Sequence, residues 1–354
     1  MRQESKAFLE AMLALPSPSG YEGPVREVWK EETQKFADSV DSDVHGNAIA
    51  ALNPKGSPRI MFAGHMDELG LQVAHIADNG YLHFHTIGGF DASTIPGRKV
   101  RIHTATGPVL GVTGRKAIHL MSQEERGKPS KIHEMWIDIG AKDAEAARKL
   151  VAIGDPVTYE PNFELMGEGL AVARGFDDRM GAFVVAEALR QVAMGKEKPR
   201  AALYAVATVQ EEIGLRGART SAFGIDPLVG IAVDVTHATD HPEVDKRRVG
   251  DVKLGEGPVI TRGANINPKV FTLLVQLAEK ENIPHQVEAT AGGTGTDANA
   301  IQLTRAGVAT GLLGVPLRYM HTPVEVLSLS DLAAASRLLA AFALAVDDNT
   351  NFVP

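Results

Sequence analysis

Two adjacent carboxylates, Glu211 and Glu212, follow an apolar run in the segment 205–214 (AVATVQEEIG). The β-branched and small residues of this run are typical of a buried strand, and no helical face follows on which the charges could be solvated. Two carboxylates at the end of a buried strand repel each other and lose hydration unless a cation lies beside them. The segment therefore predicts a cationic partner, which is either a metal ion or an arginine.

Other potential metal ligands also lie at the ends of predicted strands or at the start of a predicted helix. His65 and Asp67 come after the apolar strand 58–63, and they face the same side if the chain stays extended. The remaining candidates lie just before a helix, at the end of a strand or shortly after one: Asp177, Asp178, Asp234 and His321. Sites in open α/β sheets form at the carboxyl ends of strands, so we expect these side chains to converge.

The types of these residues indicate a site for divalent metal ions. The chain has no cysteine, so a metal must be held by histidine and carboxylate, and neither a thiol nucleophile nor a disulfide can form. Two histidines with three or four carboxylates suit two ions such as Zn²⁺, Co²⁺ or Mn²⁺. Two ions about 3.5–4 Å apart need a bridging carboxylate and a bridging water, and a further carboxylate must stay free as general base. Of Glu211 and Glu212, one can bind a metal ion while the other acts as the general base.

The elements that must position this site alternate between helix and strand on both sides of a β-rich stretch. Between about residues 70 and 165, short β-rich runs are separated by turn residues, and one short helical piece (143–151) interrupts them. Regularly spaced short strands favour a small barrel or sandwich. We therefore predict an α/β fold with a mixed central sheet flanked by helices and an inserted, small, barrel-like all-β domain. The predicted domains are 1–69 plus 168–354 (catalytic) and 70–167 (inserted).

Apolar periodicity predicts the individual elements. The predicted helices are 6–15, 23–36, 178–194, one that begins at Asn267-Pro268, and 331–346. The predicted strands of the α/β part are 44–52, 58–63, 201–210, 228–233 (ending at Asp234) and 308–315. Those of the insertion are 71–76, 81–86, 99–104, 109–114, 135–139 and 156–160.

Composition narrows the class of protein. With 354 residues, 44% hydrophobic and 23% charged, the chain reads as globular. A net charge of −8 without a Lys/Arg run argues against nucleic acid as a partner. No apolar run approaches ~18 residues and no secretory signal is visible, so we expect no membrane association and a cytoplasmic location.

Six motifs jointly carry a family resemblance that spans nearly the whole chain. They are GHMDELG (64–70), GFDDRMG (175–181), VQEEIGLRGA (209–218), VDVTH (233–237), GGTGTDANAI (292–301) and RYMHTPVEV (318–326). In this order they resemble the cellulase-M/glutamyl aminopeptidase/tetrahedral aminopeptidase family of dinuclear metallopeptidases (clan MH). The loop 292–297 is two residues longer than the GGTDA usual in the family, and its role stays open.

The resemblance implies a ligand set for two divalent ions per chain. Asp177 would bridge both ions. His65 and Asp234 would complete one site, and Glu212 and His321 the other. The native metal, Zn, Co or Mn, stays open because each accepts this set.

The resemblance also implies catalytic roles and a cis peptide. Glu211 would act as general base and later as acid, and Asp67 would orient the imidazole of His65. The peptide bond after the bridging aspartate, Asp177-Asp178, would be cis. The activity implied is metal-assisted removal of N-terminal residues from peptides. The insertion would be a dimerisation domain, with dimers assembling into tetrahedral dodecamers; dimer or dodecamer, and the preferred N-terminal residue, stay open.

Several other functions are compatible with the sequence. A deacylase or other amidohydrolase could use the same metal site, although the β insertion disfavours it. An endoglucanase would use Glu211 with another carboxylate, but would leave the histidines unexplained, and only 5% of the residues are aromatic. A non-catalytic assembly protein is disfavoured because ligands and base are intact. His237, Arg318 and Tyr319 are candidate substrate-binding residues, with packing at the edge of the core as the alternative for the last two.

Overall fold

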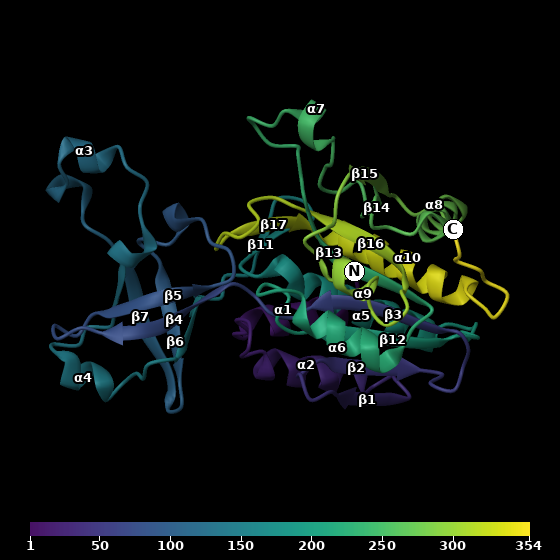
Figure 1. Ribbon diagram of the computed structural model, residues 1–354, viewed down its shortest axis with the longest axis horizontal. Helices are drawn as coiled ribbons and strands as arrows, with labels where there is room; N and C mark the ends of the chain where they lie inside the picture. The colour runs from purple at the N-terminus through teal and green to yellow at the C-terminus, as the bar shows by residue number, and fades with distance from the viewer.

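The computed structural model describes residues 1–354 and shows a large α/β part beside a smaller β-rich part (Figure 1). The large part is built on an eight-stranded mixed sheet. The order of its strands is β1 (Ser39–Ser42), β2 (Ala48–Leu52), β12 (Ala202–Thr208), β3 (Arg59–His65), β13 (Val229–His237), β16 (Ala309–Leu317), β14 (Val259–Gly263) and β15 (Gln286–Thr290). The inner strands β12, β3, β13 and β16 are parallel, so their carboxyl ends share one edge.

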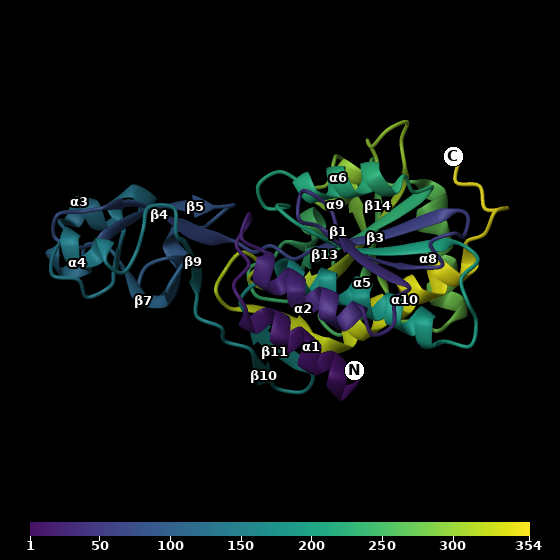
Figure 2. The ribbon, with the colours of Figure 1, turned by 90° about the horizontal axis from the view of Figure 1, so that it is seen from below.

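Helices cover both faces of this sheet (Figure 2). One face carries α1 (Gln3–Ala14), α2 (Gly23–Thr33), α5 (Phe176–Met194), α8 (Pro268–Lys280) and α10 (Leu329–Ala345), and the other carries α6 (Arg216–Ile225) and α9 (Asp297–Ile301). Strand alternation divides the cores: Ile60 and Phe62 of β3 join the larger core, and Met61 and Ala63 the smaller. At Gly64 a Cβ atom would collide with the backbone of α5, so only glycine permits this close approach.

The smaller part is a closed barrel with its own core of 14 buried residues. Its strands run in the order β4 (Gly70–Ile76), β5 (Leu82–Ile87), β8 (Trp136–Asp138), β7 (Gly107–Gly114), β6 (Lys99–Thr104) and β9 (Pro156–Tyr159). Short helical pieces connect them: η1 (Ala92–Thr94), η2 (Ile118–Leu120), α3 (Gln123–Arg126), η3 (Ile132–Glu134) and α4 (Ala144–Arg148). The predicted α/β fold with an inserted barrel is confirmed.

A third, three-stranded sheet lies where the chain returns from the barrel. It contains β10 (Glu164–Met166), β11 (Leu170–Ala173) and β17 (Glu325–Ser328). A short helix, α7 (Lys246–Val249), lies on the segment that projects from the large part in Figure 1. No helix combines the length and the apolar character needed to cross a bilayer.

Several details of the sequence prediction are wrong, and two concern the site and the insertion. The strand predicted to end at Asp234 continues to His237, because all nine residues of β13 pair with β16. The insertion contains α3 in addition to the predicted helix. Its four residues are held by a capping box between Ser122 and Glu125, and they are too few to produce a periodic pattern.

Candidate metal centre

The predicted ligands gather at the shared carboxyl edge of the parallel strands. His65 is the last residue of β3, and Glu211 and Glu212 lie in the turn after β12. His321 follows β16 by a short turn in which it has a positive φ of 61°. Asp234 lies within β13 rather than at its end. Chain segments more than 100 residues apart in sequence are thus brought to one place.

Asp177 lies between the two histidines. Its Oδ1 is 3.2 Å from His65 Nε2, and its Oδ2 is 3.2 Å from His321 Nε2. The nearest oxygen of Glu212 is 3.8 Å from the same His321 nitrogen. Ligand atoms of His65, Asp177 and Glu212 all lie within 4.8 Å of one another. One carboxylate therefore faces two imidazoles through different oxygens.

A second group of ligand atoms within 4.8 Å of one another consists of His65, Asp178 and Asp234. Both carboxylate oxygens of Asp178 accept backbone N–H groups, from His65 (3.0 Å) and Gly181 (3.1 Å). Asp178 therefore anchors α5 to the end of β3. The peptide bond between Asp177 and Asp178 is cis, as the resemblance implied.

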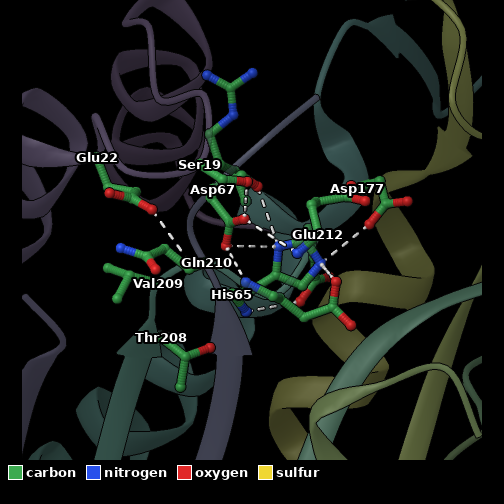
Figure 3. A network of polar contacts seen from close by, with 12 residues as sticks. Ser19, Glu22, His65, Asp67, Asp177, Thr208, Val209, Gln210 and Glu212 are labelled. Carbon is green, nitrogen blue, oxygen red and sulfur yellow. Dashed lines mark hydrogen bonds and ion pairs between the residues drawn. The ribbon is translucent and has the colours of Figure 1, made fainter. Parts of the chain in front are cut away.

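Asp67 joins the two turns that carry the site (Figure 3). Its Oδ1 lies 3.4 Å from His65 Nδ1 and accepts the N–H of Glu211 at 3.0 Å. Its Oδ2 accepts the N–H of Glu212 at 3.2 Å and the hydroxyl of Ser19 at 2.6 Å. Asp67, which is fully buried, thus fixes the imidazole and both glutamate backbones together.

Burial and charge perturb the titration of these groups. Burial raises the pKa of Glu211 to about 10 and that of Asp234 to about 8, with neighbouring carboxylates adding to the effect and His65 opposing it. Burial would raise the pKa of Asp177 as well, but its contacts with His321 and His65 hold it below its ordinary value. The site thus gathers more buried carboxyl groups than its two histidines can hold in the ionised form.

The donor set fits divalent cations. Glu212 Oε1 is buried without any hydrogen-bond partner, although its other oxygen faces His321. A buried carboxylate oxygen without a donor is costly unless a cation takes that place. Histidine nitrogens and carboxylate oxygens are the ligands that Zn²⁺, Co²⁺ and Mn²⁺ accept.

The predicted substrate-binding residues lie at the end of β13 and just after β16. His237 is the exposed last residue of β13, and Tyr319 is 52% exposed with its ring centroid 6.3 Å from that of His241. Arg318 forms a two-point ion pair with Asp240, with distances of 2.8 and 2.7 Å. Its guanidinium therefore already has a carboxylate partner within the chain.

Sequence reasoning missed several supporting residues. Glu325, which is 2% exposed, accepts the backbone N–H groups of Asp177 (3.2 Å) and His321 (3.0 Å). Asp297 accepts the hydroxyl of Thr208 at 2.5 Å. Both carboxylates lie inside quoted motifs (318–326 and 292–301), which was the one signal available for them. Ser19 lies outside every motif, and no spacing pointed to it.

A mixed α/β sheet that gathers histidines and carboxylates at the carboxyl edge of its parallel strands is the arrangement of a metal-dependent hydrolase. The chain belongs to the M42 glutamyl aminopeptidase family, whose profile matches residues 46–338. It is therefore an aminopeptidase, and membership of this metallopeptidase family implies divalent metal ions.

Individual relatives agree with this assignment. Lysyl aminopeptidase of Pyrococcus furiosus is 40% identical over 328 residues, which cover 92% of each chain. The TET aminopeptidase of the marine sediment archaeon Thaumarchaeota archaeon SCGC AB-539-E09 superposes with a TM-score of 0.93 at 34% identity, over 97% of each chain. The Pyrococcus horikoshii TET1 peptidase, which can assemble into a tetrahedron or a large octahedral shell, gives 0.86 at 33% identity over 97% of this chain and 100% of its own.

Proposed function

We propose that the chain is a dinuclear metallo-aminopeptidase that removes N-terminal residues from peptides. The observation that carries this proposal is the place of Asp177, whose two oxygens each lie 3.2 Å from a different histidine. A carboxylate in this position suits two ions held side by side. A single ion would leave one of its oxygens, together with Glu212 or Asp234, without a function.

The residues divide into two ligand sets that share Asp177. His65 and Asp234 would hold one ion with it, and Glu212 and His321 the other. The donor types accept Zn²⁺ or Co²⁺, and also Mn²⁺. When bound, such ions make water more acidic and polarise a carbonyl group, which is the chemistry that peptide hydrolysis needs.

Glu211 is the proposed general base. Its Oε2 lies 3.7 Å from His65 Nε2, at the centre of the cluster. In this role it takes a proton from the attacking water and then gives it to the amine that leaves when the peptide bond breaks. Asp67 supports both events, because it holds the backbone N–H of Glu211 and lies beside Nδ1 of His65, which leaves Nε2 facing Asp177.

The remaining assignments concern substrate and assembly. We assign residues 1–69 and 168–354 to a catalytic domain and 70–167 to a dimerisation domain. The chain would form homodimers through the insertion, and these would build a tetrahedral dodecamer, as the P. horikoshii TET1 peptidase can assemble into a tetrahedron. Such a chamber would admit peptides rather than folded proteins. His237 and Tyr319 would face the substrate, while Arg318 would brace the rim through Asp240.

Hydrolysis of a panel of aminoacyl-p-nitroanilides, before and after metal removal, tests the function. We expect release of nitroaniline that a chelator abolishes and that Zn²⁺, Co²⁺ or Mn²⁺ restores. Carboxymethylcellulose, assayed in parallel, should not be cleaved. Full activity after complete removal of metal would contradict the proposal, and cleavage of the polysaccharide alone would favour the endoglucanase alternative. The panel also identifies the preferred N-terminal residue.

A further inference from the structure

The loop between α1 and α2 lies against both turns of the metal centre. Its Pro18 forms an isolated parallel β-bridge with Glu68. Two backbone hydrogen bonds join the segments, from Ser19 N–H to Glu68 O (3.3 Å) and from Glu68 N–H to Ser17 O (2.9 Å). The loop therefore follows the segment that carries His65 and Asp67. It precedes residue 46, where the match to the family profile begins.

Ser19 completes the hydrogen bonding of Asp67. The serine is 4% exposed, and its hydroxyl donates to Asp67 Oδ2 at 2.6 Å. That oxygen also accepts the N–H of Glu212. Without the hydroxyl, Asp67 would lose the shortest of its hydrogen bonds, and its carboxylate could turn away from the Glu211–Glu212 backbone.

Glu22 holds the other end of the same turn. It is 6% exposed, and its Oε1 accepts the N–H of Gly20 at 2.7 Å and that of Gln210 at 3.1 Å (Figure 3). Gln210 has a φ of 56°, in the left-handed region that residues with a side chain rarely adopt. Because Gln210 directly precedes Glu211, this conformation decides the direction in which the glutamate leaves the strand.

We propose that Ser19 and Glu22 are positioning residues for the reaction: Ser19 fixes Asp67, Glu22 fixes the Gln210 backbone, and together they aim Glu211 at the reacting water. The inference rests on the proposed role of Glu211. Neither side chain forms a hydrogen bond or ion pair with the side chain of a proposed metal ligand; the partners are Asp67 for Ser19 and two backbone N–H groups for Glu22. Their loss should therefore lower turnover while leaving metal content and substrate binding nearly unchanged.

The hydrogen bonds of Glu22 and Ser19 determine which substitutions can separate a positioning role from a general loss of structure. Glu22 acts through one oxygen that accepts two N–H groups, and the amide oxygen of glutamine can do the same. Glu22→Gln should therefore rescue what Glu22→Leu, of similar bulk, loses. Ser19→Thr keeps the hydroxyl that Ser19→Ala removes. Glu27→Gln is the matched control, since Glu27 lies on the adjacent helix α2 with its side chain 56% exposed.

The experiment compares these variants of the metal-loaded, full-length protein by two independent measurements. Steady-state kinetics on the best aminoacyl-p-nitroanilide should give a kcat lowered about 10- to 100-fold in Ser19→Ala and Glu22→Leu, with KM and metal content within twofold, because small misplacement of a catalytic group costs this much. Hydrogen exchange of the amides in residues 207–213 should accelerate in Glu22→Leu and return towards the wild-type rate in Glu22→Gln.

The following results would contradict the inference that Ser19 and Glu22 position Glu211. A kcat within twofold of wild type in both Ser19→Ala and Glu22→Leu would overturn it, as would loss of metal or an equal loss in the leucine and glutamine variants. If Glu22→Leu does not fold, the Ser19 pair supplies the same comparison. A wild-type protein without aminopeptidase activity would refute the proposed function, whereas unchanged exchange in Glu22→Leu would refute the positioning itself.

Discussion

Glu211 and Glu212 are neighbours in sequence, but their surroundings separate their roles. Glu212 faces His321 at 3.8 Å, and its other oxygen is buried without a partner. Glu211 lies nearer to His65, at 3.7 Å. Asp67 accepts the backbone N–H of each, and so both side chains are held in place. These differences support Glu212 as ligand and Glu211 as base.

Glu211→Gln tests that division directly. The amide keeps the shape of the side chain but cannot take a proton, so we expect kcat to fall at least about 10²- to 10⁴-fold. Elemental analysis of the purified variant should still find metal close to the wild-type content. Glu212→Gln is the matched comparison and should lose metal. Loss of metal in Glu211→Gln with retention in Glu212→Gln would mean that the two roles are reversed.

The residues of the site differ in how far sequence could predict them. The proposed ligands stand next to predicted strand ends or a predicted helix start, and the resemblance carried by the motifs implied their roles. The Ser19 hydroxyl donates to the carboxylate of Asp67, 48 residues away. Glu22 and Glu325 accept the backbone N–H groups of Gln210 and Asp177, which are 188 and 148 residues away. Such contacts depend on the fold and leave no local pattern in the sequence.

At the scale of elements, periodicity predicted the strands with apolar runs or clear alternation and missed several short ones. All six barrel strands and the strands β2, β12, β3, β13 and β16 of the large sheet were found, since they carry apolar runs or alternation. The missed strands, β1, β10, β11, β14, β15 and β17, have only three to five residues each, and β1 and β15 are edge strands that contain charged or polar residues. The end of β13 was missed because pairing with β16, rather than apolar sequence, extends it.

A buried ion pair joins three elements behind the metal centre. Glu68, just after β3, contacts Arg174 at the end of β11, and its Oε2 lies 3.0 Å from Arg179 of α5. All three side chains are less than 5% exposed. Removing one partner would leave uncompensated buried charge, so Glu68→Gln should destabilise the fold by about 3–5 kcal/mol at neutral pH.

The effect should depend on pH in a defined direction. Burial would raise the pKa of Glu68, but Arg174 and Arg179 hold it below its ordinary value. The ion pair therefore stabilises the fold fully above the unfolded pKa of about 4.3, and this contribution is lost as the pH falls through the lower folded pKa. Denaturant unfolding should show a gap between wild type and Glu68→Gln that is wide at pH 7 and narrows in acid. Glu145→Gln, with its side chain 82% exposed, should show almost no gap; a constant gap for Glu68→Gln would contradict the argument.

At the scale of the whole molecule, every proposed metal ligand comes from the α/β part, while the barrel has a separate core. The barrel supplies none of these ligands, although its Phe90 and Tyr159 line the same small cavity as Asp177, Glu212 and His321. Its outer surface offers a second role. On β7, Leu110 and Val112 point outward with 47% and 45% exposure, while Gly111 and Thr113 between and beside them are buried. Exposed apolar side chains in a row on one strand are typical of a contact surface.

If this face of the barrel forms the proposed dimer contact, charge placed on it should break the assembly. The double substitution Leu110→Glu and Val112→Glu puts two carboxylates where apolar surfaces would meet, and we expect sedimentation velocity to give a smaller species than wild type. Its circular dichroism and thermal unfolding should be unchanged, because neither side chain belongs to the barrel core. Thr106→Glu, in the exposed turn between β6 and β7, adds charge to the same module without touching this face and should keep the wild-type size. An unchanged size in the double variant would exclude β7 from the contact, and a monomeric wild-type protein would exclude the dimerisation role of the barrel altogether.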